Sequence, residues 1–110
     1  MYWCKKLYVG EMAAVNQKEI IRSLKRRKWS VGIYVITLSE NEHNLLDIYE
    51  TIQFEQPYYR KKKLNIVGVA VSKKEAFALV TNIIEDVYTL TGSFKVREYF
   101  MTKKNKRKNE

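Results

Sequence analysis

The sequence predicts an α+β domain whose strands and helices follow in the order β-α-β-β-α-β. Residues 64–71 form a short, apolar and β-branched run, which is the pattern of a buried central strand. A long stretch with apolar residues every three or four positions comes directly after it, as expected on one face of a helix. A similar strand and helix precede them in the first 28 residues, so the two halves repeat one pattern.

The longest predicted helix begins after Ser72 and ends at Gly92. Ser72 and Glu75 have the spacing of a capping box, in which the serine oxygen accepts from a first-turn N–H and the glutamate reaches back to the cap. Gly92 stands where a helix ends in a left-handed residue. Residues 94–97 then alternate apolar and basic, which predicts a final edge strand. The predicted apolar stripe of the helix consists of Ala76, Phe77, Val80, Ile83, Ile84, Val87 and Tyr88.

The first half of the chain has the same strand–helix–strand order. Residues 6–10 read as a strand, and Asn16 with Glu19 forms a second capping box before a helix that ends in the basic run 25–28. Residues 31–38 predict a second strand with apolar side chains on both faces. Residues 45–54 fit helical and strand patterns alike, and we interpret them as an insertion that starts helical and becomes extended.

Together these elements predict a ferredoxin-like fold, a four-stranded antiparallel sheet with two helices on one face and an insertion between the second and third strands. The single domain spans residues 1–101, and residues 102–110 form a basic, disordered tail. Because the central strands are apolar on both sides, the sheet face without helices would be an exposed apolar surface. We expect the insertion, another subunit or a ligand to cover it.

Composition limits the classes of function. The chain has 110 residues, and 21 Lys and Arg against 12 Asp and Glu give a net charge of +9, which favours polyanionic partners. No run is long enough to span a membrane and no signal peptide is present, so we expect a cytoplasmic protein without a membrane partner. With Cys4 as the only cysteine and His43 as the only histidine, we expect no disulfide, no metal site and no cofactor.

The sequence does not predict catalytic residues. Cys4 and His43 are a nucleophile and a base by type, but no third group orients them, and Cys4 fits better as a small apolar packing residue. Glu85 and Asp86 point about 100° apart around a helix, so they do not converge as an acid/base pair. No glycine-rich phosphate loop occurs. We therefore expect a non-enzymatic protein.

Two resemblances to known families can be stated. Leu7-Tyr8-Val9-Gly10-Glu11-Met12 resembles the first-strand motif of the RNA recognition motif, in which an aromatic ring on the sheet face stacks a base. The third strand of that family also carries exposed aromatics, and residues 64–69 carry none, which argues against this mode of RNA binding.

The second resemblance rests on five segments, at residues 56–60, 67–70, 75–76, 91–92 and 97–100. Together they are similar to a family of small uncharacterised proteins from Gram-positive bacteria. This resemblance implies a bacterial origin and agrees with the predicted fold, and it implies no activity.

Two functional hypotheses remain, and we favour the first. In the first, the chain is an interaction module that forms a homodimer through the apolar sheet face, with candidate contacts at Tyr8, Tyr34, Ile36, Val67 and Val69. In the second, it binds nucleic acid electrostatically through basic clusters at 25–28, 60–63 and 103–108. The candidate contacts of the second hypothesis are Lys25, Arg26, Arg27, Lys28, Tyr58, Tyr59, Arg60, Lys61, Lys62 and Lys63. A solvated, solubilising surface is the alternative reading of the same charges.

Overall fold

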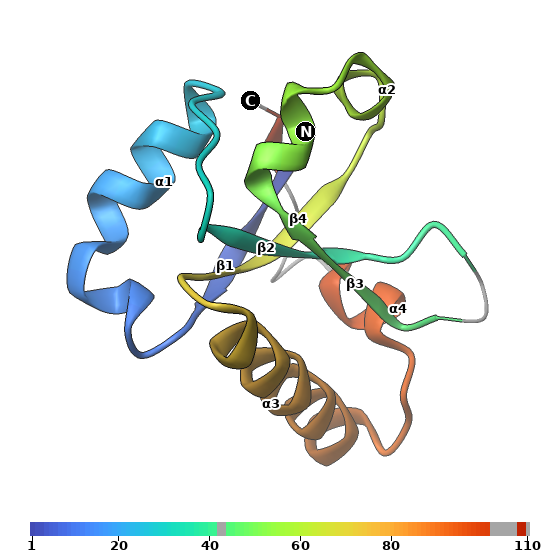
Figure 1. Ribbon diagram of the computed structural model, residues 1–110. Coiled ribbons are helices and arrows are strands. Elements are labelled where there is room, and N and C mark those ends of the chain that lie inside the picture. Colours follow the sequence, from blue (N-terminus) through green and yellow to red (C-terminus); the bar gives the residue numbers. More distant parts are fainter. Residues whose placement is uncertain (42–43, 102–107, 110) are drawn as a thin grey trace.

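The computed structural model describes residues 1–41, 44–101 and 108–109 (Figure 1). A mixed sheet of strand order β3-β2-β4-β1-β5 forms its centre. The four long strands are β1 (Tyr2–Val9), β2 (Tyr34–Leu38), β3 (Leu46–Glu50) and β4 (Asn65–Ala70). β1 and β4 run parallel, whereas β2 is antiparallel to β3 and to β4. The two residues of β5 (Lys108–Asn109) pair antiparallel with the start of β1.

Helical segments cover both faces of this sheet. On one face lie α1 (Gln17–Lys25), which follows the 3₁₀ turn η1 (Ala13–Asn16), and the pair η2 (Thr51–Glu55) and α2 (Pro57–Arg60). On the other face lie α3 (Lys73–Thr91) and α4 (Val96–Phe100). Figure 1 shows α1 and α3 well apart, with strands of the sheet between them. The result is a helix–sheet–helix arrangement in three layers.

Strand side chains alternate between the two faces and so divide the interior into two apolar cores. The core beneath α3 and α4 contains Cys4, Ile36, Leu38, Val67, Leu79, Ile83, Val87, Val96 and Phe100. The core beneath α1 and η2 contains Trp3, Leu24, Val35, Phe54, Leu64, Ile66 and Val69. A Cβ on Gly68 would lie 3.1 Å from the side chains of Ile36 and Leu79, so this glycine lets α3 approach the sheet closely.

The α+β class is confirmed, and the ferredoxin-like, purely antiparallel sheet is wrong. The central pair β1–β4 is parallel, and the helices lie on both faces. Residues 94–97 do not form the last strand: Val96 and Phe100, four residues apart, are both buried on one side of α4. The alternation over residues 94–97 is too short to distinguish the two-residue period of a strand from the three-to-four-residue period of a helix.

The segment 45–54 also differs from its prediction, because it starts as a strand and ends as a helix. β3 pairs with β2 in an unbroken antiparallel register from Tyr34–Glu50 to Leu38–Leu46. The apolar pattern of this segment fits a helix and a strand alike, and the backbone pairing with β2 makes it a strand. Together with α1, the following η2 and α2 cover the sheet face opposite α3, so the insertion is the one of the three expected covers that the structure shows.

The helix ends follow their local signals in part. Ser72 Oγ accepts from the Glu75 N–H at 3.0 Å, and Gly92 has a left-handed φ of 74°, as predicted. Asn16 makes no side-chain cap hydrogen bond, because η1 already turns the chain into α1. The disordered tail stays a prediction, since the structure describes only residues 108–109 beyond position 101. No helix among the described residues has the length and apolarity needed to cross a membrane.

Candidate functional site

Cationic side chains line the exposed side of α1. Lys18, Arg22, Lys25 and Arg26 are spaced by four, three and one residues and border an open groove of about 450 Å³. The opposite side of the helix places Leu24 in the core. Because α1 carries only one carboxylate, at Glu19, it presents an excess of positive charge to solvent.

The basic run 25–28 turns the chain away from α1. Arg27 has a φ of 60°, a left-handed conformation that ends the helix. The Lys28 N–H then donates a hydrogen bond to the Ser23 carbonyl oxygen at 2.9 Å. The ammonium of Lys25 lies 5.6 Å from the centre of the Trp3 ring, a cation–π contact over a buried residue. The cations therefore sit at the end of the helix where the dipole favours them.

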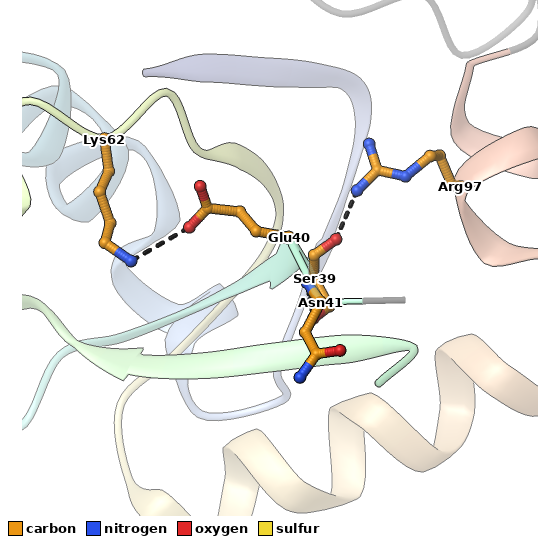
Figure 2. Close-up of polar contacts among 5 residues, drawn as sticks. All are labelled: Ser39, Glu40, Asn41, Lys62 and Arg97. Carbon is orange, nitrogen blue, oxygen red and sulfur yellow. Dashed lines mark hydrogen bonds and ion pairs between the residues drawn. The ribbon is translucent and has the colours of Figure 1, made fainter. Parts of the chain in front are cut away.

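A second cationic cluster follows α2. Pro57 occupies the first turn of this helix, where its missing N–H costs nothing. Tyr58 and the lysines at 61–63 line an open groove of about 710 Å³, with Glu40 at its border. The ammonium of Lys62 lies 3.1 Å from the Glu40 carboxylate (Figure 2) and 5.0 Å from the centre of the Tyr58 ring. The hydrogen bond to Glu40 raises the pKa of Lys62.

The two clusters lie more than thirty residues apart in the sequence, and an aromatic cluster brings them to one side of the molecule. The Trp29 ring packs edge-on against Phe54 at 5.1 Å, and Phe54 contacts Tyr59 at 6.1 Å. Trp29 follows the basic run 25–28 directly, and Tyr59 comes just before Arg60. Residues 18–28 and 57–63 thus border the same sheet face, and we call their exposed cations the cationic surface.

Of the two candidate tyrosines, only Tyr58 presents its ring to solvent. Tyr58 is 68% exposed, whereas Tyr59 is half-buried between Tyr49 and Phe54. Tyr59 therefore supports the surface from beneath, and Tyr58 offers an aromatic face for stacking.

Charge differs strongly between the two sides of the sheet. Residues 18–28 contain six cations and one carboxylate, and residues 51–63, which include η2 and α2, contain four cations and one carboxylate. Residues 73–98, which include α3 and most of α4, contain four cations and four carboxylates. The positive charge of the described chain is therefore concentrated on the side of α1 and α2.

The residues expected at a self-association surface do not form one. Ile36 and Val67 are buried beneath α3, and Val69 is buried on the opposite side of the sheet. Tyr34 is half-buried and packs against the core beneath α3. Since helices cover both faces, these side chains are enclosed by their own chain.

Tyr8 is also held within the chain and does not stand open on the sheet as a base-stacking ring would. Its hydroxyl donates to the Asp86 carboxylate at 2.9 Å, and its ring contacts Phe100 at 5.9 Å. Burial, followed by the hydrogen bonds with Tyr99 and Asp86, raises the pKa of Tyr8. The resemblance to the RNA recognition motif therefore does not extend to an exposed aromatic at this position.

A further groove, of about 810 Å³, lies between the end of β2 and α4. Arg97 donates to the carbonyl oxygen of Ser39 and so ties α4 to the sheet (Figure 2). Lys95 and Arg97 line this groove together with Glu40 and Glu98, so its charges balance. It lacks the charge excess of the cationic surface.

The described residues contain no grouping of three His, Cys, Asp or Glu side chains that could hold a metal ion. Cys4 is buried, and burial raises the pKa of its thiol. His43 and most of the basic cluster at 103–108 lie outside the described residues.

No protein-family model, curated protein or solved structure matches this chain. The resemblance to a family of small proteins from Gram-positive bacteria therefore stays a prediction.

Proposed function

We propose that this protein binds nucleic acid through the cationic surface of α1, the turn that follows it, and residues 57–63. The observation that carries the proposal is the concentration of positive charge on this one side of the sheet, beside a side of balanced charge. A cationic surface attracts phosphates because each neutralised phosphate releases condensed counterions. Surface solubility alone requires net charge and does not require its segregation.

Two features of the surface suit an extended phosphate backbone. The cations of α1 follow the helix as a row, and four of them line one open groove. Phosphate contacts by lysine and arginine need no strict geometry, so the binding is expected to be independent of sequence. This is a non-enzymatic function, in which the chain contributes position and charge and no reacting group.

The groove beside Tyr58 adds a site for an unpaired base. Glu40 holds the ammonium of Lys62 5.0 Å from the centre of the exposed Tyr58 ring. A base stacked on Tyr58 would have its phosphates next to Lys61 and Lys63. Single strands are therefore expected to bind more tightly than duplexes, because their bases are available for stacking.

The proposal is tested by the salt dependence of binding to a fluorescein-labelled single-stranded oligonucleotide. The logarithm of the association constant is expected to fall linearly with the logarithm of salt, by about 0.7 per phosphate contact. A triple variant, Arg22→Gln/Lys25→Gln/Arg26→Gln, removes three exposed cations and is expected to lower this slope by about 2.

A matched control removes the same charge from the opposite side. In Lys73→Gln/Lys74→Gln/Lys95→Gln the net charge falls equally, and the affinity and slope, measured in dilute and monomeric protein, are expected to stay near those of the unmodified chain. Equal losses in both triple variants would mean that only net charge matters, and would refute a defined surface. Absence of binding at low salt would refute the function itself.

A further inference from the structure

α3 carries more apolar surface than its core uses. Ala76, Leu79, Ile83 and Val87 are buried against the sheet. A second row, which we call the outer stripe, consists of Phe77, Thr81, Ile84 and Tyr88, and these four positions fall within about 60° around the helix. Phe77 is 56% exposed and Tyr88 is 52% exposed. The sequence pattern had merged both rows into one stripe.

The outer stripe is unusually apolar for a surface that faces water. Its Tyr88 end is extended by Phe94, whose ring stacks on Tyr88 at 4.9 Å and is itself 52% exposed. Among the described residues, no helix or strand lies over the outward side of α3 (Figure 1). Exposed apolar side chains gathered on one helix face are typical of an interaction surface.

We infer that a second copy of this chain covers the outer stripe, with the two α3 helices packed antiparallel about a two-fold axis at the level of Val80 and Thr81. Around this axis, Phe77 of one copy meets Ile84 of the other. Lys73 comes level with Tyr88 of the other copy, where an ammonium and an aromatic ring attract each other. Each of these contacts occurs twice, as two-fold symmetry requires.

The charges beside the stripe select a second copy in this orientation. Lys74 and Glu85 are eleven residues apart, which is three turns plus about 20°, so both lie on the same edge of the stripe. In an antiparallel helix pair, equal edges face each other, as in antiparallel coiled coils. Lys74 of one copy and Glu85 of the other are then separated by only about 3 Å along the helix axis. A parallel pair would leave Lys74 and Glu85 of the two copies eleven residues, about 16 Å, apart along the axis.

This surface is separate from the cationic surface, because α3 and α1 cover opposite faces of the sheet. A dimer through α3 leaves both cationic surfaces exposed, so the inference does not depend on nucleic-acid binding. The surface that one helix per subunit can bury is smaller than the roughly 800 Å² per partner of a stable interface. The dimer is therefore expected to form reversibly, and its mass has to be measured over a range of protein concentrations.

Sedimentation equilibrium of the full chain tests the inference. The mass is expected to rise from 13.1 kDa towards twice that value as the protein concentration increases. Phe77→Lys places a charge in the stripe and is expected to raise the dissociation constant at least about tenfold. The matched control is Val31→Lys, at a position 76% exposed and outside α3, which is expected to leave the constant unchanged. Circular dichroism confirms that each variant is folded.

A charge exchange tests the orientation. Lys74→Glu and Glu85→Lys each place like charges opposite each other and are expected to weaken the dimer, whereas the double variant is expected to restore it. A chain that stays monomeric at millimolar concentration overturns the inference, and so does a dimer that Phe77→Lys leaves intact. A double variant as weak as the single variants overturns the antiparallel arrangement.

Discussion

Replacement of Glu75 by alanine is expected to destabilise the fold, because this side chain joins three segments. One carboxylate oxygen accepts from the Val71 N–H at 2.8 Å, and the other accepts from the Met12 N–H at 2.5 Å. The Glu75 N–H in turn donates to Ser72 Oγ. The end of β4, the turn after β1 and the first turn of α3 therefore meet at one carboxylate.

The magnitude follows from these contacts. A hydrogen bond to a charged group contributes about 1.5–3 kcal/mol to stability. The Met12 N–H is exposed, so water replaces much of its bond, whereas the Val71 N–H is partly buried. We therefore expect Glu75→Ala to lower the free energy of unfolding by about 2–3 kcal/mol.

Gly10 provides a second way to disturb the same contact. A Cβ at this position would lie 2.3 Å from Cδ of Glu75 and 2.5 Å from its Cγ. Gly10→Ala must therefore push the carboxylate away from its partners, at an expected cost of about 1–3 kcal/mol. In the Glu75→Ala background the clash is gone, and the same substitution is expected to cost less than about 0.5 kcal/mol.

Urea unfolding of the two single variants and the double variant measures this coupling. Glu98→Ala is the control, because it removes an exposed carboxylate and is expected to change stability by less than about 0.5 kcal/mol. The reasoning is refuted when Gly10→Ala costs the same in both backgrounds, since the effects of unconnected residues add.

Three further outcomes are expected. Gly68→Ala brings a methyl group within 3.1 Å of the Leu79 side chain, and should lower the free energy of unfolding by about 1–2 kcal/mol in the same urea assay, while an unchanged midpoint would contradict the close approach of α3. Cys4 should react slowly with a thiol reagent in the folded chain and rapidly in urea, because burial raises its pKa and limits access; equal rates would contradict its burial. Tyr58→Ala should weaken binding of single strands by about 1–3 kcal/mol without changing the salt slope, and an equal loss for duplexes would argue against stacking on this ring.

Local signals were the part of the fold that the sequence could predict well. The spacing of Ser72 and Glu75, and the glycine at position 92, act within a few residues, and each defines its helix end. Glu75 departs from its predicted partner because the tertiary fold brings the Met12 and Val71 amides closer to its carboxylate. The capping-box motif thus identified Glu75 as a residue of the helix start, whereas the partners of its carboxylate depend on the tertiary fold.

Tertiary pairing decided the elements that were predicted wrongly. Residues 46–50 became a strand because β2 offered an edge with which to pair. Periodicity in α3 identified its apolar residues, but it could not separate those that face the sheet from Phe77 and Tyr88, which face outward. The basic runs 25–28 and 60–63 can be seen in the sequence, whereas their position over the same sheet face depends on the aromatic contacts around Phe54.

Lysine footprinting tests the location of the proposed binding surface most directly. Brief acetylation with and without a single-stranded oligonucleotide, followed by peptide mass spectrometry, gives the protection of each lysine. Binding at the cationic surface is expected to protect Lys25, Lys28 and Lys61 and to leave Lys73 and Lys74 on α3 as reactive as before. Equal protection of all lysines, or stronger protection of those on α3, would contradict nucleic-acid binding through α1 and α2.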